Sequence, residues 1–287
     1  MAQSIEITGP NAEQIEFWNG VAADKWIEHN ALLDRMLGGL GLRAMNRADP
    51  KPGEHVLDVG CGCVDTTLEL ARRVAPTGSV TGLDVSGPML ALAERRVAAA
   101  SAPVSIANAD AETYDLPQAS FDLVYSRFGV MFFNSPEAAF ANFHAALRPG
   151  GRLAFVCWRA PDLNPWVNLP FEAARPHLPS FEPAGPEDPG QFAFARSERV
   201  ERILAAAGFT DVRLDAHDET LSVGEGDLDA CVGLMLKLGP VSRLLREAGE
   251  AAIPPVAAAV RAAVAPYHTG ETLEMASSSW IVSAHRA

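Results

Sequence analysis

A glycine turn that follows an acidic residue is the first feature of this sequence that could carry chemistry. The apolar run of residues 55–60 leads into Gly60, Cys61 and Gly62, and helix-forming residues follow from Asp65. Backbone N–H groups at a turn from strand to helix bind anions and carboxylates, and the helix dipole strengthens this attraction. The turn therefore predicts a site for a small ligand.

The residues around this turn discriminate between possible ligands. The dinucleotide-binding pattern Gly-x-Gly-x-x-Gly requires a third glycine, which "GCGCVD" does not have. It also lacks the Gly-Lys-Ser/Thr of a P-loop, which argues against nucleoside triphosphate chemistry. Asp58 lies two residues before Gly60, and its carboxylate would repel a pyrophosphate but bind an ammonium group. The ligand is therefore expected to carry an amino group and a carboxylate.

Two further carboxylates follow the next apolar runs. Asp84 stands at the end of one and can accept hydrogen bonds from a ribose diol, while Asp110 follows another and can accept from the exocyclic amine of a purine. Amino acid, ribose and adenine, in that order, describe S-adenosylmethionine. Taken alone, Asp84 could equally be a helix-capping carboxylate.

These residues need a sheet that brings strand ends together. Strand patterns at 55–60, 79–85, 104–110, 121–128 and 152–158 alternate with helix patterns at 65–75, 86–100 and 135–151. This alternation predicts an α/β fold with a doubly wound parallel sheet and helices on both faces. Ligands bind beyond the carboxyl ends of such strands, so the loops after residues 59, 84, 110 and 125 should converge.

The chain divides by composition into a core and additions to it. We predict an N-terminal helical cover (1–50), a cofactor-binding core (51–158) and an irregular proline-rich lid (159–196). A continuation of the core (197–217), a helical cap insertion (218–272) and a closing strand (273–287) follow. The later strands bring the expected sheet to seven.

Five motifs in order give the core a resemblance to a known family. They are "VLDVGCG", "VTGLDVSGPML", "ANADAETYDLP", "FDLVYSRFGVMFF" and "ALRPGGRLAF", which together cover about residues 54–158. They resemble the class I S-adenosylmethionine-dependent methyltransferases, and most of all the branch of the ubiquinone and menaquinone C-methyltransferases (methyltransferase type 11). The resemblance implies a Rossmann-like seven-stranded sheet, S-adenosylmethionine as methyl donor and S-adenosylhomocysteine as product.

The resemblance also implies a role for each residue that matches a motif. The implied cofactor contacts are Asp58, Gly60, Cys61 and Gly62 at the methionine moiety, Asp84 at the ribose with Val85 next to it, Met89, Asp110 and Ala111 at the adenine, Ser126 near the sulfonium, and Trp18 and Trp26 on a covering helix. Outside this pattern, Met89 would be interpreted as core, and the two tryptophans, eight residues apart, as a packing stripe.

Val64 departs from the resemblance, because related sequences commonly have glycine at this position. A β-branched residue resists positive φ, so valine would be strained if the turn required it there. We expect instead that position 64 already belongs to the helix, since Gly60 and Gly62 can supply the tight turn. Cofactor binding should then survive in weakened or reshaped form, and Val64→Gly should tighten it.

The methyl acceptor is less well specified by the sequence. Methyl transfer from a sulfonium depends on proximity and alignment, and an acidic acceptor also needs a general base. The candidate catalytic residues are His29, His177 and Arg127, whereas His144 is expected to be structural. Aromatic residues after the fourth strand and in the lid predict an apolar or aromatic acceptor, or merely pack the cap: Phe128, Phe132, Phe133, Trp166, Phe171, Phe192 and Phe194.

Charge and cysteine content restrict partners and location. The 287-residue chain has a formal net charge of −13 and no basic run, which argues against a nucleic-acid partner. No secretory leader or membrane-spanning stretch is recognised, and the four cysteines show no zinc-ligand pattern, so we expect reduced thiols, no metal and a cytoplasmic location. We expect no membrane partner, and a monomer or homodimer. The alternatives are an NAD(P)-dependent oxidoreductase and a methyltransferase-like binding protein without activity.

Overall fold

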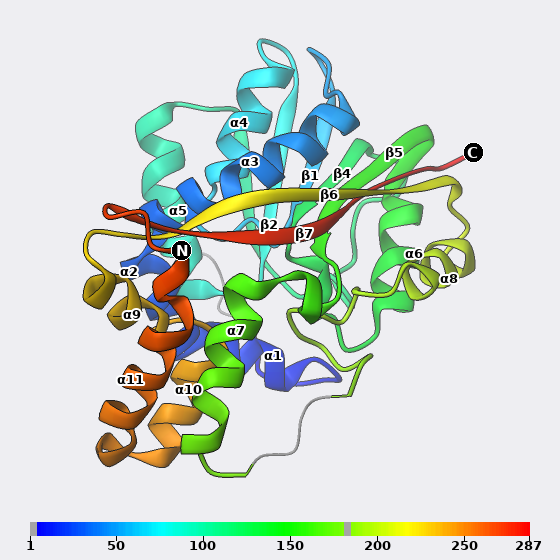
Figure 1. The fold of residues 1–287 in the computed structure, drawn as a ribbon. Helices are drawn as coiled ribbons and strands as arrows, with labels where there is room; N and C mark the ends of the chain where they lie inside the picture. The colour runs from blue at the N-terminus through cyan, green and yellow to red at the C-terminus, as the bar shows by residue number, and fades with distance from the viewer. Residues whose placement is uncertain (1–4, 181–184) are drawn as a thin grey trace. The chain divides into compact units, whose positions relative to one another are not determined.

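The computed structural model describes residues 5–180 and 185–287. Its centre is a seven-stranded sheet in the order β3-β2-β1-β4-β5-β7-β6 (Figure 1). The strands are β1 His55–Val59, β2 Ser79–Asp84, β3 Val104–Asn108, β4 Phe121–Arg127, β5 Leu147–Trp158, β6 Thr210–Glu225 and β7 Thr272–His285. β1 to β5 pair in parallel. The predicted doubly wound α/β class is confirmed.

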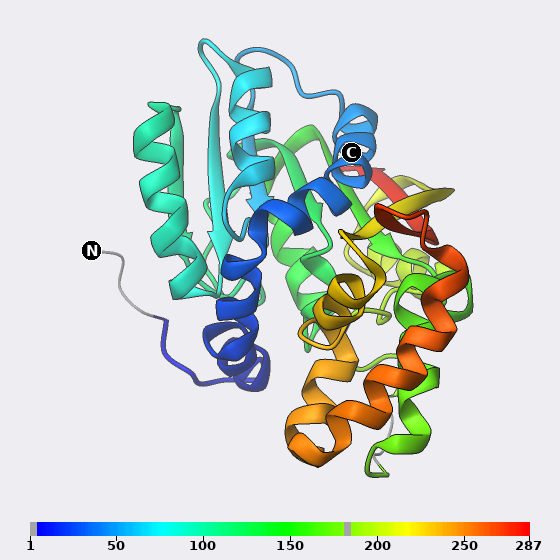
Figure 2. The same cartoon turned by 60° about the vertical axis from the view of Figure 1, so that its left-hand side comes forward.

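Helices cover both faces of the parallel part. Right-handed crossovers place α4 (Asp65–Val74) and α5 (Gly87–Ala100) on one face and α6 (Pro136–Ala146) on the other. On the first face, α3 (Asn30–Ala48) contacts α4 and β4, and α8 (Ser197–Ala206) contacts α6 on the second (Figure 2). Two short helices, α1 Ala12–Asn19 and α2 Val21–Glu28, precede α3.

The chain forms two compact units. Unit 1 contains residues up to 157 with 187–216 and 279–287, and unit 2 contains 158–186 and 217–278. Unit 2 holds the outer parts of β6 and β7 and the helices α7 Pro165–Ala174, α9 Leu228–Met235, α10 Gly239–Ala248 and α11 Ile253–Val264. Helix α11 packs on α7 and α9 through Val256, Val260 and Val264, buried at every fourth position. None of the described helices combines the length and apolar character needed to cross a bilayer.

Three boundaries differ from the sequence prediction for physical reasons. Helix α6 ends at Ala146 rather than 151, because Pro149 disfavours helical backbone at the residue before it, and β5 starts there. Residues 165–174 form α7 where an irregular lid was expected; a proline at the first turn and an apolar buried face support this helix. β6 extends further than predicted, to Glu225, because it pairs with β7, as the Ser277 Oγ–Glu219 O hydrogen bond of 2.9 Å illustrates. Residues 181–184 of the predicted lid lie outside the described residues.

An aromatic core fills the space beneath α6. Ring centroids of neighbouring pairs lie 5.5–6.4 Å apart among Phe133, Phe140, Phe143, Phe155 and Phe194. Phe133 and Phe194 are 8% and 1% exposed, so these two aromatic residues pack the core of unit 1.

Helix α3 lies close against β4 at a single glycine. The Tyr125 hydroxyl donates a hydrogen bond of 2.8 Å to the Gly41 carbonyl, and a Cβ at Gly41 would lie 2.7 Å from Arg127 Cδ. At Gly38, one turn earlier, a Cβ would meet nothing within 4 Å. Packing therefore requires glycine at position 41 of this helix but not at position 38.

Alanine at these two positions should change stability in opposite directions. Gly38→Ala should raise the free energy of unfolding by about 0.5–1 kcal/mol, because glycine weakens a helix interior. Gly41→Ala should lower it by about 1–3 kcal/mol through overpacking. Urea denaturation followed by circular dichroism measures both, and changes of the same sign would contradict this account of the helix contact.

Candidate active site

The loops that follow β1, β2 and β4 meet at the carboxyl edge of the sheet. Gly60 N and Cys61 N donate to Leu83 O at 2.8 and 3.2 Å, which joins the first loop to the end of β2. A Cβ at Gly60 would lie 2.8 Å from the Cα of Gly129, in the loop after β4. Gly60 and Gly62 have φ of 69° and 51°, which glycine adopts without strain. The expected convergence of these loops is confirmed.

Asp58, at the end of β1, is a buried carboxylate with unused hydrogen-bonding capacity. Oδ2 accepts from Thr66 Oγ1 at 2.8 Å and from Thr67 Oγ1 at 2.7 Å, whereas Oδ1 is buried and has no hydrogen-bond partner among the described residues. Burial raises the pKa of Asp58 to about 6, although the two threonine hydroxyls and Arg127 oppose the rise. A buried acceptor without a donor fits a cationic ligand group.

Asp84, at the end of β2, organises the glycine loop. Its Oδ2 accepts from Gly62 N at 2.8 Å and its Oδ1 from Ser86 N at 2.8 Å. Burial raises the pKa of Asp84, while the amides of Ser86, Gly62 and Val85 lower it. Each carboxylate oxygen can accept a second hydrogen bond, so Asp84 could still receive one from a ribose hydroxyl.

The loop after β3 carries the acidic residues Asp110 and Glu112. Asp110 Oδ1 accepts from Glu112 N at 3.1 Å and from Asn11 Nδ2 at 3.3 Å. Glu112 in turn accepts from the backbone amides of residues 134 and 135, and the Ala111 carbonyl accepts from Asn142 Nδ2 at 3.0 Å. This loop is therefore held against both the N-terminal segment and the start of α6.

Ser126 and Arg127, at the end of β4, make contacts within the protein. The Ser126 hydroxyl donates to Val59 O at 2.7 Å and accepts from Gly129 N at 3.2 Å. Arg127 Nη1 donates to Asp34 Oδ1 at 2.6 Å. Ser126 thereby ties the loops after β1 and β4 together, and Arg127 supplies a positive charge that favours ionisation of Asp58.

An aromatic cluster from the N-terminal helices covers the glycine loop. The Trp18 ring lies 5.9 Å from the Trp26 ring and 5.0 Å from the Phe132 ring, measured between centroids in edge-on geometry. Trp18 and Trp26 pack against a buried group that includes Cys63 and Met89. Trp18 and Trp26, from the predicted cover, therefore lie together with Met89, the predicted adenine contact, beside the glycine loop.

The two cysteines of the loop are interior residues. Cys61 packs with the core between α4 and α5, and burial raises its thiol pKa well above the usual value. Burial likewise raises the pKa of the Cys63 thiol to about 11. Over residues 5–180 and 185–287, no group of three or more His, Cys, Asp and Glu side chains is arranged to hold a metal ion.

Val64 contradicts the conformation that we expected at this position. It has φ 68° and ψ 19° and precedes the first residue of α4, so it adopts the left-handed conformation that a glycine would adopt freely. Its side chain is fully buried and packs against Leu90 and Ala93 of α5. Burial of the isopropyl group therefore compensates for backbone strain of about 1–3 kcal/mol, and the side chain lies in the core between α4 and α5.

The two contributions at Val64 can be separated by truncation. Val64→Ala should lower the free energy of unfolding by about 1–3 kcal/mol, because it removes buried methyl groups and keeps the strain. Val64→Gly should be more stable than Val64→Ala by about 1 kcal/mol, because glycine relieves the strain. Ala71→Gly, in the interior of α4, is the matched control, and there alanine should be the more stable residue. A Val64→Gly variant less stable than Val64→Ala would contradict the strain.

The histidine candidates occupy different environments. His29, between α2 and α3, has a buried Nε2 without a hydrogen-bond partner among the described residues, whereas His177 is exposed in unit 2. The His144 ring packs 5.1 Å from the Phe209 ring, as its expected structural role requires.

Several polar residues of the site had no recognisable signal in the sequence. Asn19 connects the cover to the loop after β2. Its Nδ2 donates a hydrogen bond of 2.9 Å to Val85 O, and its Oδ1 accepts one of 3.0 Å from Gly87 N. Asn11, Asn30, Arg96 and Glu112 also contact loops of this edge. Only the folded chain brings these isolated residues next to the motifs.

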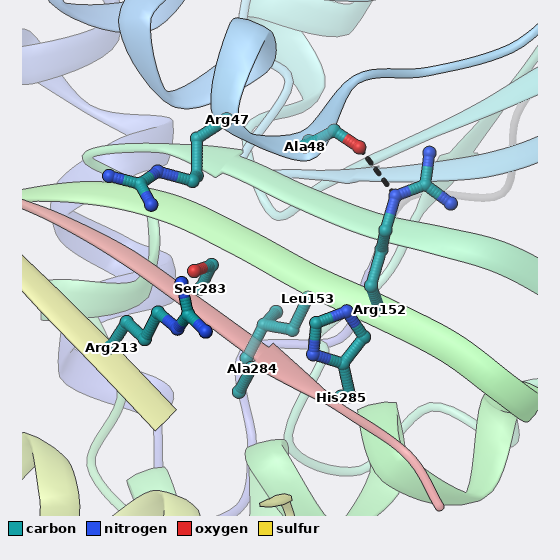
Figure 3. Close-up of a pocket in the computed structure, with 8 residues that line it drawn as sticks. All are labelled: Arg47, Ala48, Arg152, Leu153, Arg213, Ser283, Ala284 and His285. Atoms are coloured by element: carbon teal, nitrogen blue, oxygen red, sulfur yellow. Dashed lines mark hydrogen bonds between the residues drawn. The ribbon is translucent and has the colours of Figure 1, made fainter. Parts of the chain in front are cut away.

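A cavity of about 250 Å³ lies at the amino edge of the sheet, away from the glycine loop. Figure 3 shows its lining residues Arg47, Ala48, Arg152, Leu153, Arg213, Ser283, Ala284 and His285. Arg152 donates to the Ala48 carbonyl and pairs with Glu54 at 2.8 Å, and Arg47 pairs with Asp215. Glu54 and Asp215 thus offset much of the positive charge of the arginines that line the cavity.

Comparison with known proteins identifies the class that this fold and site define. Residues 56–151 match the family described as "Methyltransferase domain". The nocamycin O-methyltransferase of Saccharothrix syringae is 31% identical over 200 residues, which cover 67% of this chain and 71% of the relative. The demethylmenaquinone methyltransferase of Thermus thermophilus is 32% identical over 198 residues, 62% of this chain and 87% of the relative. The chain belongs to the class I S-adenosylmethionine-dependent methyltransferases, in the branch that includes the quinone methyltransferases.

A solved structure agrees with this fold. Phosphoethanolamine N-methyltransferase 2 of Haemonchus contortus, in complex with S-adenosyl-L-methionine, superposes with a TM-score of 0.55 at 20% identity, over 94% of this chain and 57% of that chain. Membership of the family that the two relatives show makes the protein a methyltransferase that uses S-adenosylmethionine.

Proposed function

We propose that the three carboxylates at the ends of β1, β2 and β3 hold the cofactor from one end to the other. Asp58 takes the ammonium group, Asp84 the ribose hydroxyls, and Asp110 with Ala111 the adenine edge. Gly60, Cys61 and Gly62 contribute backbone beside the methionine moiety. The observation that carries this proposal is the Asp58 Oδ1 atom, which is buried without a hydrogen-bond donor among the described residues.

The N-terminal helices complete this proposed site. Trp18, Trp26 and Met89 form an apolar wall beside the loop, suited to the adenine and to the methylene groups of the cofactor. Arg127 is 12% exposed at its side chain and already paired with Asp34, so we assign it an electrostatic role beside Asp58 rather than a role in proton transfer.

The acceptor is proposed to be an apolar or aromatic small molecule with an acidic hydroxyl or carbon. The two relatives are named for nocamycin and demethylmenaquinone, which are both small molecules. The aromatic cluster of Trp18, Trp26 and Phe132 offers a surface for such a molecule. A net charge of −13 disfavours a nucleic-acid acceptor.

Cofactor affinity should fall in acid because of Asp58. With a pKa of about 6, this carboxyl is ionised at pH 7.5 and mostly protonated at pH 5. Calorimetric titration should therefore give a dissociation constant for S-adenosylmethionine about tenfold higher at pH 5 than at pH 7.5.

The control for this titration is Asp58→Asn, which should bind weakly at both pH values and lose the acid-dependent step. An unchanged dissociation constant in Asp58→Asn would rule out the ammonium contact. Titration with NAD tests the oxidoreductase alternative, because heat with NAD alone would overturn the assignment of the whole site.

His29 is the stronger candidate for a general base, because its Nε2 is buried in unit 1 and makes no hydrogen bond among the described residues. Glu28 Oε1, 3.6 Å from Nε2, would stabilise the imidazolium that forms when His29 takes a proton. With a phenolic or hydroquinone acceptor found by screening for S-adenosylhomocysteine release, His29→Gln should lower kcat by about 10²-fold or more. His177→Gln, at an exposed position, should leave kcat within about twofold. Equal rates for wild type and His29→Gln would exclude His29 as the base.

The same screen tests the alternative of a binding protein without activity. Binding of S-adenosylmethionine without turnover of any acceptor in the screen would favour that alternative.

A further inference from the structure

The guanidinium of Arg96, on α5, joins three separate segments. Nη1 donates to the Cys63 carbonyl and to Asp65 Oδ1, both at 2.9 Å, and Nη2 donates to Asn30 Oδ1 at 2.6 Å. Asn30 Nδ2 completes a ring by donating to Asp65 Oδ2 at 2.9 Å. Arg96 thus contacts the glycine loop, the start of α4 and the start of α3 at once.

Two of these contacts lie on either side of the strained residue. Cys63 and Asp65 are the immediate neighbours of Val64, whose φ is 68°. A guanidinium is planar and its donors are fixed in direction, so Arg96 holds the backbone carbonyl on one side of Val64 and the Asp65 side chain on the other. The charge-assisted bond to Asp65 is of the stronger kind. Without these contacts, a β-branched residue would favour negative φ.

The third contact reaches the N-terminal cover. Asn30 is the first residue of α3 and is 5% exposed. Trp26, four residues earlier, places its Nε1 only 3.9 Å from where a Cβ of Gly62 would stand. The Arg96–Asn30 bond therefore holds the start of α3 at the same loop that Trp26 covers.

We propose that Arg96 is a positioning residue for cofactor binding, which holds the loop around Val64 in its left-handed conformation and locks the α2–α3 cover onto it. This inference rests on the proposed function, in which the glycine loop receives the amino-acid end of S-adenosylmethionine. Arg96 contacts the loop from the side of α5 and acts through the backbone that it holds.

Calorimetric titration of the full chain with S-adenosylmethionine tests this role. Arg96→Ala should raise the dissociation constant at least tenfold, with kcat at saturation changed by no more than about twofold. Arg96→Lys should recover only part of the affinity, because a single ammonium cannot reproduce the fork. Arg95→Ala is the matched control, since Arg95 is the exposed neighbour on the same helix, and its dissociation constant should stay within about twofold of wild type.

The Val64→Gly background separates positioning from general stabilisation. Glycine adopts positive φ without support, so Arg96→Ala made in Val64→Gly should raise the dissociation constant by no more than about threefold. If Arg96→Ala does not fold, Asn30→Ala, which removes the two hydrogen bonds that join α3 to Arg96 and Asp65, should raise the dissociation constant by a few-fold.

Two results would overturn the proposal. One is a dissociation constant for Arg96→Ala within twofold of wild type; the other is the same loss of affinity in the wild-type and Val64→Gly backgrounds. Failure of the proposed cofactor site would be recognised differently, because Asp58→Asn would then bind S-adenosylmethionine as tightly as the wild-type protein.

Discussion

The buried carboxylate of Asp58 is the constraint on which the site depends. A carboxyl with a pKa near 3.9 in the unfolded chain and about 6 in the folded protein destabilises the fold by about 3 kcal/mol when ionised. Because the pKa is raised on folding, this destabilisation is fully present above pH 6 and disappears as the pH falls from 6 toward 4. Two threonine hydroxyls stabilise one oxygen, and the other remains available to a ligand. The folded protein thus retains an unfavourable charge that a cationic ligand can neutralise.

The second feature is backbone strain beside this charge. Val64 and Phe128, in the loops after β1 and β4, both have positive φ, at 68° and 61°. Such strain persists only where surrounding contacts enforce it. At Val64 the enforcing contacts are the packing of its own side chain and the ring of hydrogen bonds among Arg96, Asp65 and Asn30. Charge and strain therefore occur at the same edge of the sheet, where a ligand can exploit both.

The N-terminal cover unites these features. Asn11 and Asn19 attach it to the loops that follow β3 and β2, and Asn30 attaches it to the start of α4. Trp18 and Trp26 then place an apolar surface over the loop. A cover held by separate polar contacts at three places gives a cofactor site with a polar base and an apolar wall, which suits a cofactor with a zwitterionic end and an aromatic end.

The sequence by itself determined the class of fold and the strand ends that form the site, because the alternation of strands and helices and the position of each acidic residue after a strand are local features. It did not determine the conformation of Val64: two glycines seemed sufficient for the turn, yet positive φ continues to residue 64. That outcome depends on Leu90, Ala93 and Arg96 of α5, which are distant in sequence. The helix α7 and the length of β6 were also decided by tertiary structure, since burial against α11 and strand pairing outweigh weak local preferences. Local patterns specify where a ligand can bind, and long-range packing decides how the loop that binds it is held.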